Sequence, residues 1–173
     1  MKRSELEALI RAIPDFPKPG ILFRDITPLL KDPRGFATAV DLLADEFVGE
    51  DVDFVVAVEA RGYVIGAPLA YKLGAGLIPV RKPGKLPYTT IKADYALEYG
   101  TNTLEVHADA ITAGHRVIIV DDLLATGGTA AATKTLVERL GGEVIGAGFI
   151  IELAALGGRA KLGSTPVRTL LTY

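Results

Sequence analysis

The feature that most constrains the fold of this chain is residues 117–129, which read VIIVDDLLATGGT. Four apolar β-branched residues in a row predict a strand buried on both faces, as is typical of parallel sheets. Two acids follow, and then a turn of small residues leads into a helical pattern that begins at Thr129. A buried strand, a turn and a helix in this order predict an α/β fold.

The rest of the chain repeats this alternation of buried strands and helices. Asp32-Pro33 predicts a helix start, because Asp caps free N–H groups and Pro suits the first helical position. We therefore expect one domain over residues 1–173, with a central, mainly parallel sheet flanked by helices. The predicted elements are an amphipathic N-terminal helix with Leu6, Leu9, Ile10 and Ile13 on one face, a helix carrying Phe36, Val40, Leu43 and Phe47, strands 54–58, 76–80, 117–120, 144–151 and 167–172, and helices 62–73 and 129–140.

Two segments interrupt the alternation. Residues 14–28 are rich in Pro but contain interleaved apolar residues, so we predict a structured cap rather than a linker. Residues 81–99 (RKPGKLPYTTIKADYALEY) show no clear core periodicity. A long segment of this kind inside a compact domain is typically a functional lid or a binding loop.

Composition excludes several kinds of partner and chemistry. The chain has 19 Lys and Arg against 21 Asp and Glu, so we expect it to bind neither nucleic acid nor a membrane surface. No run approaches the roughly 18 apolar residues of a membrane span, and Glu5, Glu7 and Arg11 interrupt what would be the core of a signal peptide. Cys is absent, which excludes disulfides, thiolate metal sites and a Cys nucleophile and fits a reducing cytoplasm.

The small-residue turn predicts a phosphate site. Gly127 and Gly128 lack a Cβ, so the backbone there can approach a ligand closely. The free N–H groups and the positive dipole end of the following helix suit a phosphate, and Thr126 and Thr129 add hydroxyl donors. Together with Ala125, these residues form the expected phosphate grip.

The two adjacent acids, Asp121 and Asp122, predict a sugar beside that phosphate. They follow the strand at the edge where open α/β sheets bind ligands, and carboxylates accept the hydrogen bonds that sugar hydroxyls donate. Taken singly, a pair of acids after a strand also occurs at phospho-acceptor and magnesium sites, and a Gly-Gly turn can be a tight connection. The triphosphate loop and the dinucleotide fingerprint are excluded, because their Gly-Lys-Ser/Thr and GxGxxG patterns are missing.

A second anion site is predicted at Glu59-Ala60-Arg61, which follows the strand 54–58 and opens a helix. Arg61 can contact a phosphate through two N–H groups. The alternative is a surface ion pair between Arg61 and Glu59.

Three cations, Arg81, Lys82 and Lys85, follow the strand 76–80 and begin the predicted lid. Such a charge run is commonly a solvated face. Its position directly after a buried strand favours diphosphate binding instead.

The segment VIIVDDLLATGGT (117–129) resembles the phosphoribosyl diphosphate motif of the type I phosphoribosyltransferases. With its flanks, as AGHRVIIVDDLLATGGTA (113–130), it is similar to members of this family that act on adenine. Four further segments are similar, in order and spacing, to members of this family that act on adenine. They are GILFRDITPLL (20–30), VEARGYVIG (58–66), RKPGKLP (81–87) and ADYALEYG (93–100). The resemblance covers nearly the whole chain. It implies the type I phosphoribosyltransferase fold, with a base-binding cap or hood at about residues 1–30 and a mobile catalytic loop at 81–100.

The resemblance also implies an activity, which is transfer of the 5-phosphoribosyl group from phosphoribosyl diphosphate to adenine, giving AMP and pyrophosphate in purine salvage. Such a pentosyl transfer passes through an oxocarbenium-like transition state. Mg²⁺ is expected to be carried mainly by the diphosphate and by water, so no protein metal ligand is assigned. A cytoplasmic homodimer is expected.

Family roles transfer to matching positions. Glu98 is implied to be the catalytic carboxylate that meets the purine N7, and Tyr99 to pack on the substrate or seal the lid. Phe23 is implied to stack on adenine, with Arg24 bracing its loop. The alternative is that Phe23 is ordinary core and that Arg24 forms a local ion pair with Asp25.

The remaining roles concern phosphoribosyl diphosphate. The resemblance assigns the ribose hydroxyls to Asp121 and Asp122, and the 5′-phosphate to residues 125–129. Pyrophosphate is assigned to residues 59–61, with a cis peptide between Glu59 and Ala60. Arg81 and Lys85 are implied diphosphate ligands, Arg81 with the option of reaching across a dimer interface.

Two other functions stay open at this stage. One is the same chemistry on xanthine, hypoxanthine or orotate, which the segments FRDITPLL and LEYG disfavour. The other is a regulator that binds phosphoribosyl diphosphate without catalysis. Such regulators add a DNA-binding domain, for which this chain has no room.

His107 and His115 show neither triad nor metal spacing, so we predict structural roles for both.

Overall fold

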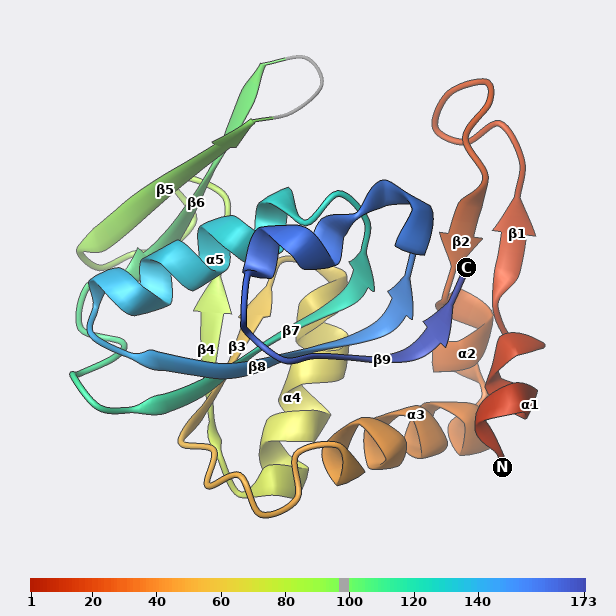
Figure 1. Cartoon of the computed structure of the whole chain (residues 1–173), viewed down its shortest axis with the longest axis horizontal. Coiled ribbons are helices and arrows are strands. Elements are labelled where there is room, and N and C mark those ends of the chain that lie inside the picture. Colours follow the sequence, from red (N-terminus) through yellow and green to blue (C-terminus); the bar gives the residue numbers. More distant parts are fainter. Residues whose placement is uncertain (97–99) are drawn as a thin grey trace.

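The computed structural model of the chain describes residues 1–96 and 100–173, and a parallel sheet forms its centre (Figure 1). The sheet has five strands in the order β4-β3-β7-β8-β9, and each neighbouring pair is parallel. The strands are β3 (Phe54–Val58), β4 (Gly76–Val80), β7 (Arg116–Leu124), β8 (Glu143–Glu152) and β9 (Val167–Thr172). The predicted α/β architecture is confirmed.

Helices cover both faces of this sheet (Figure 1). Val55 of β3 packs into the cluster formed with α3 (Pro33–Asp45) and α4 (Arg61–Leu73). Val56, the next residue, packs into the cluster on the other face, with α5 (Gly128–Arg139). Because successive side chains of a strand point to opposite faces, a sheet covered on both sides needs continuous apolar runs.

The predicted helix boundaries follow from local capping. Asp32 accepts a hydrogen bond from the N–H of Gly35 at 2.6 Å, and Pro33 is the first residue of α3. The helix α4 ends at Leu73, and the C-cap residue Gly74 adopts the left-handed conformation. Thus local sequence alone was sufficient at these ends.

The N-terminal helix is much shorter than predicted. The helix α1 covers only Arg3–Glu7, and Arg11–Ile13 forms a strand, β1, that pairs antiparallel with β2 (Phe23–Asp25). Pairing with β2 therefore overrides the helical spacing of the apolar residues. The helix α2 (Thr27–Lys31) follows, so residues 14–28 contain a paired strand and the start of a helix and are not a linker.

The segment 81–99 is not a loop throughout, which corrects the sequence interpretation. Residues Thr90–Ala96 form β5, which pairs antiparallel with β6 (Thr101–His107). Ala93 and Leu104 of this hairpin are buried against the face of the sheet that α5 covers. The hairpin is therefore anchored to the core at its base and extends beyond the sheet (Figure 1).

Two short 3₁₀ helices, Ala154–Leu156 and Gly158–Leu162, connect β8 to β9. Within residues 1–96 and 100–173, no helix is long and apolar enough to cross a membrane. Both His side chains make local contacts, His107 with the N–H of Tyr88 and His115 with the N–H of Thr112.

Candidate functional site

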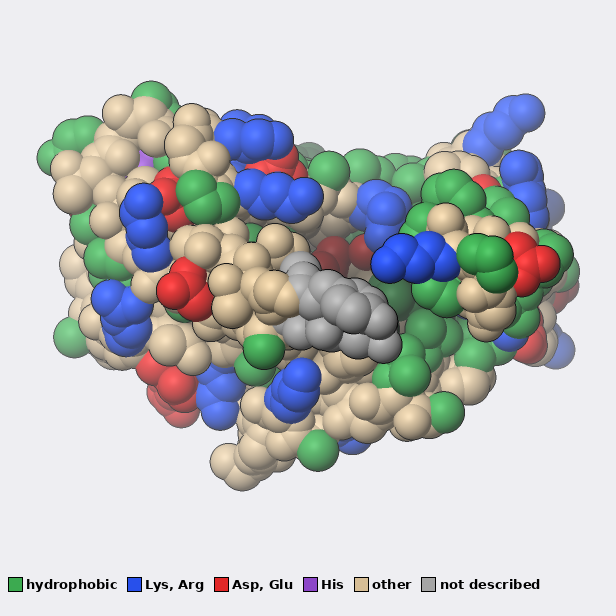
Figure 2. Space-filling view, turned by 90° about the horizontal axis from the view of Figure 1, so that it is seen from above, with side chains coloured by type: hydrophobic (Ala, Val, Ile, Leu, Met, Phe, Trp, Pro, Cys, Tyr) green, Lys and Arg blue, Asp and Glu red, His purple; other side chains and the backbone are tan. Residues whose placement is uncertain are grey.

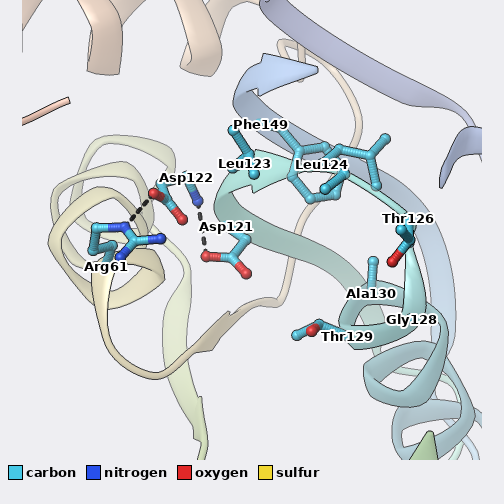
Figure 3. A pocket seen from close by; sticks show the side chains of 12 residues that line it. Arg61, Asp121, Asp122, Leu123, Leu124, Thr126, Gly128, Thr129, Ala130 and Phe149 are labelled. Carbon is cyan, nitrogen blue, oxygen red and sulfur yellow. Dashed lines mark hydrogen bonds and ion pairs between the residues drawn. The ribbon is translucent and has the colours of Figure 1, made fainter. Parts of the chain in front are cut away.

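A cavity of about 210 Å³ opens where β7 meets the N-terminus of α5 (Figure 3). The strand β7 extends four residues beyond the predicted VIIV because β8 continues alongside it, whereas its pairing with β3 stops at Val120. The two acids therefore lie past the last β3–β7 pair, and both line the cavity. The cavity is lined by Arg61, Asp121, Asp122, Leu123, Leu124, Ala125, Thr126, Gly127, Gly128, Thr129, Ala130 and Phe149.

The turn before α5 has the backbone geometry of an anion site. Gly127 is the N-cap of α5 with φ of +81°, and none of the first-turn residues, all of them described, is acidic. A Cβ on Gly127 would lie 2.4 Å from the carbonyl oxygen of Gly158. Only a residue without a side chain fits there, so the turn packs directly against the backbone of Gly158. This leaves the free N–H groups at the start of α5 available to a ligand.

The two acids differ in their surroundings. Asp122 is buried, and its Oδ2 accepts a hydrogen bond from Arg61 Nε at 2.5 Å (Figure 3). Asp121 Oδ1 accepts from the N–H of Asp122 at 2.8 Å. Desolvation, reinforced by the charge of Asp122, raises the pKa of Asp121 well above its usual range. Sugar hydroxyls that donate to these oxygens would replace lost hydration.

Arg61 joins this cavity to a second one of about 380 Å³. The two share Arg61, Asp121, Asp122 and Thr129 in their walls. The alternative of a surface pair between Arg61 and Glu59 is not what the structure has, since Arg61 pairs with Asp122. The peptide bond between Glu59 and Ala60 is cis, as the resemblance implied. The second cavity is lined by Val58, Glu59, Ala60, Arg61, Lys82, Tyr95, Leu104, Asp121, Asp122 and Thr129.

Glu59 organises the predicted cations beside this second cavity. Its carboxylate accepts hydrogen bonds from Lys85 Nζ at 2.7 Å and from Arg81 Nε and Nη2 at 3.3 Å each. It also accepts from the N–H of Lys82 at 3.1 Å. The hydrogen bond from Lys85 is the main reason that the pKa of Glu59 is lowered to about 2. Glu59 therefore stays ionised and binds the cations of Arg81 and Lys85. One negative charge against two positive charges leaves this group of side chains with a net positive charge.

The charge pattern of the surface agrees with this geometry. Figure 2 shows Lys and Arg side chains around a hollow between the two hairpins, with acidic side chains deeper inside it. A positively charged rim favours the approach of an anionic substrate.

Phe23 and Arg24 lie on β2, in the cap. The guanidinium of Arg61 lies 5.7 Å from the centre of the Phe23 ring, so that ring borders the site. Arg24 instead stacks on the ring of Tyr173 at 3.8 Å, and Asp25 pairs with Arg11 at 3.8 Å. The alternative of a local ion pair between Arg24 and Asp25 is thus replaced by two separate contacts.

Sequence reasoning missed several lining residues. Phe149 lies in the middle of β8, fully buried, and an aromatic residue in an apolar strand gives no sign of facing a ligand cavity. Tyr95 lies in the segment 81–99 that was interpreted as a loop, and Leu104 lies on β6, for which no strand was predicted. Their period-2 alternation across β5 and β6 is the signal that could have found them.

The catalytic assignment to Glu98, and the role given to Tyr99, fall outside the described residues. Among the residues that are described, no group of three or more His, Cys, Asp or Glu side chains could hold a metal ion.

Comparison with known proteins shows the family of the chain. The family described as phosphoribosyl transferase domain matches residues 29–165. The chain is 55% identical over 168 residues to the adenine phosphoribosyltransferase of Acidobacterium capsulatum, covering 97% of this chain and 93% of the relative.

Two solved structures have the same fold. The adenine phosphoribosyltransferase of Thermoanaerobacter pseudethanolicus superposes with a TM-score of 0.97 at 52% identity, over 99% of this chain and 100% of that one. The enzyme from Saccharomyces cerevisiae, solved with an imino-altritol bisphosphate and adenine, gives 0.92 at 44% identity, over 97% of each chain.

Proposed function

This chain belongs to the phosphoribosyltransferase family and, within it, to the adenine phosphoribosyltransferases, and from that membership we propose that it converts adenine and phosphoribosyl diphosphate into AMP and pyrophosphate. The observation that carries the proposal is the pair of adjoining cavities with Arg61, Asp121, Asp122 and Thr129 in both walls. One suits a ribose 5-phosphate and the other its diphosphate.

The first cavity is proposed to hold ribose 5-phosphate. Residues 125–129 would take the 5′-phosphate through the N–H groups at the start of α5. Asp121 and Asp122 would accept hydrogen bonds from the ribose hydroxyls. The site thereby fixes C1 of the ribose between the two cavities.

The second cavity is proposed to hold the leaving diphosphate. Adenine N9 attacks C1, the bond from C1 to the diphosphate oxygen breaks, and pyrophosphate leaves with the electron pair. The purine gives up its N7 proton, to the carboxylate proposed at N7 or to water. Arg61 and Lys82 line this cavity, and Arg81 and Lys85 stand beside it on Glu59. Preorganised cations at a leaving group stabilise the charge that develops there.

Mg²⁺ fits this arrangement as an ion carried by the substrate. Asp121 and Asp122 supply carboxylate oxygens, and Asp122 is already engaged by Arg61, so most ligands would come from diphosphate, ribose and water. When bound, the ion would neutralise charge on the diphosphate.

Base recognition is proposed to involve Phe23, with Arg24 bracing its strand from Tyr173. Glu98, which lies outside the described residues, is proposed to meet the purine N7 and to stabilise positive charge as N9 attacks. Tyr99, also outside them, is proposed to pack against the substrate. The β5–β6 hairpin would exclude the water that otherwise hydrolyses phosphoribosyl diphosphate.

A homodimer is also part of the proposal. Val64 and Tyr71 lie seven residues apart on α4, hence on one helical face, and are 42% and 90% exposed. Leu77, on the neighbouring edge strand β4, is 41% exposed. An exposed apolar surface of this kind suits a second copy of the chain. Sedimentation should therefore show a dimer that Tyr71→Lys weakens, and a monomeric wild type would contradict this.

A cytoplasmic location is also proposed, because the lack of Cys fits a reducing compartment.

The test is an assay of purified protein with phosphoribosyl diphosphate, Mg²⁺ and each purine base in turn. AMP should form from adenine, and the other bases should react far more slowly. Faster turnover of hypoxanthine or xanthine would contradict the choice of base. Tight binding of phosphoribosyl diphosphate without turnover of any base would favour the regulator instead. Glu98→Gln should lower kcat far more than it weakens phosphoribosyl diphosphate binding.

A further inference from the structure

Glu105 carries a buried carboxylate that lines neither cavity. Its side chain is 4% exposed, near the end of β6. It accepts a hydrogen bond from Lys92 Nζ at 3.0 Å and another from the N–H of Gly84 at 3.2 Å. A buried carboxylate is costly unless its partners compensate for lost hydration. The contacts with Lys92 and Gly84 therefore stabilise the ionised form of Glu105. They join β6 to β5 and to the turn that contains Gly84.

Glu105 contacts the turn 81–85 twice. Its backbone pairs with Arg81 at the start of the turn, and its side chain binds Gly84 near the end. Arg81 and Glu105 form an antiparallel bridge, with N–H···O distances of 3.0 Å from Arg81 and 2.8 Å from Glu105. One residue of β6 thus fixes both Arg81 and Gly84. The carboxylate of Glu59 also binds this turn, accepting hydrogen bonds from the N–H of Lys82 and the ammonium of Lys85. The carboxylates of Glu59 and Glu105 together form a clamp on the turn 81–85.

Lys92 extends this clamp to β5. It is the direct cross-strand partner of Glu105 in the β5–β6 ladder, so the ion pair forms across neighbouring strands on one face. The ammonium of Lys92 is on the exposed side of the pair, with 62% of the side chain accessible, whereas the carboxylate is buried. The contact therefore ties the hairpin to the turn without contributing a group to either cavity.

We propose that Glu105 is a positioning residue for phosphoribosyl diphosphate: it fixes the turn 81–85 so that Arg81 and Lys85 present their cations to the diphosphate, and it links that turn to β5 through Lys92. The inference rests on the proposed function. It predicts that the diphosphate half of the substrate, and not adenine, responds when Glu105 is changed.

The test uses three variants of the full chain. Glu105→Gln keeps the size and an acceptor for Gly84 but loses the charge. Lys92→Met removes the same ion pair from its exposed side and leaves the Glu105 carboxylate with the N–H of Gly84 as its hydrogen-bond donor, so the Tm of this variant measures the cost of that loss. Glu143→Gln is the matched control, because its carboxylate is 64% exposed and pairs with Arg116 at 3.5 Å, at the opposite end of the sheet. For each, the Kd of pyrophosphate with Mg²⁺ is measured by calorimetry, with KM for both substrates and the Tm.

Glu105→Gln should raise the pyrophosphate Kd and the KM for phosphoribosyl diphosphate by roughly five- to twentyfold, below the roughly 100-fold that a 1 Å misplacement can cost. The KM for adenine should change by less than about twofold, because the interactions that are lost are those with the diphosphate group and not those with the base. Lys92→Met should shift the same two constants in the same direction, by less. Glu143→Gln should leave all of them unchanged.

An unchanged pyrophosphate Kd in Glu105→Gln, with only a lower Tm, would show that Glu105 serves folding alone and would overturn the inference. If Glu105→Gln does not fold, Lys92→Met decides, and wild-type constants in that variant overturn it equally. A wild-type protein that binds neither pyrophosphate nor phosphoribosyl diphosphate would instead refute the proposed function.

Discussion

The turn before α5 can be tested by giving Gly127 a side chain. In Gly127→Ala, the new Cβ would lie 2.4 Å from the carbonyl oxygen of Gly158 and 2.9 Å from its Cα. Both are backbone atoms, so no side-chain rotation relieves the clash. The residue must also keep a φ of +81°, which is unfavourable for any residue with a Cβ. The substitution therefore combines backbone strain with overpacking at the phosphate grip.

The two contributions can be separated in magnitude. A left-handed conformation costs an L-residue roughly 1–2 kcal/mol, and overpacking typically adds about 1–3 kcal/mol. Gly127→Ala should then lower the free energy of unfolding by about 2–5 kcal/mol. Gly74→Ala is the control, since Gly74 has a φ of +67° but nothing within 4 Å of its Cβ position. It should lose only the first roughly 1–2 kcal/mol.

Urea unfolding of both variants, without ligand, measures these differences. Steady-state assays at low temperature, where the folded fraction is confirmed by circular dichroism, measure kcat/KM for phosphoribosyl diphosphate. That constant should fall roughly 100-fold in Gly127→Ala, as expected for a misplaced binding turn, and stay near wild type in Gly74→Ala. Equal stability losses in the two variants, with full activity in both, would refute the close approach of Gly127 and Gly158.

Three further substitutions test the charges and packing of the site. Asp121→Asn should raise the Tm of the ligand-free protein while weakening ribose 5-phosphate binding. Since the folded-state pKa of Asp121 is raised, its contribution to stability is present below its unfolded value of 3.8 and is lost as pH rises through the folded value. The gain in Tm should therefore grow with pH. A gain that shrinks would contradict the unfavourable desolvation of the Asp121 carboxylate and its repulsion from Asp122. Glu59→Gln should remove part of the acid sensitivity: the folded-state pKa of about 2 makes Glu59 stabilising above 4.5 and less so as pH falls toward 2. Identical acid unfolding curves for Glu59→Gln and wild type would argue against its ion pairs. Phe149→Ala should cost about 3–5 kcal/mol in urea unfolding, because Phe149 is fully buried; a loss below about 1 kcal/mol would mean that the site collapses easily.

Much of the ribose-phosphate site could be predicted because it is continuous in sequence. A buried strand, two acids and a Gly-Gly turn place residues 121–129 at the end of β7 without any knowledge of distant partners. The same holds for the N-terminus of α3, where Asp32 caps a helix that begins at the next residue. In both places the physical cause acts over a few neighbouring residues.

The parts that could not be predicted depend on contacts between distant segments. The strand β1 exists because it pairs with β2, so the helical spacing that included Ile13 was misleading. The pair of Arg61 with Asp122 joins residues 61 positions apart. The contacts of Glu59 with Arg81, Lys82 and Lys85 likewise join residues that are 22, 23 and 26 positions apart. Such partners are determined by how β3, β4 and β7 lie side by side, which local patterns do not encode.

The central claim is that two adjoining cavities divide phosphoribosyl diphosphate between them. Calorimetric titration of ribose 5-phosphate and of pyrophosphate, each into Gly127→Ala and Lys85→Met, tests it most directly. Gly127→Ala should lose affinity for ribose 5-phosphate and keep its affinity for pyrophosphate. Lys85→Met should do the reverse. Parallel loss of both ligands in both variants would contradict the division of the site.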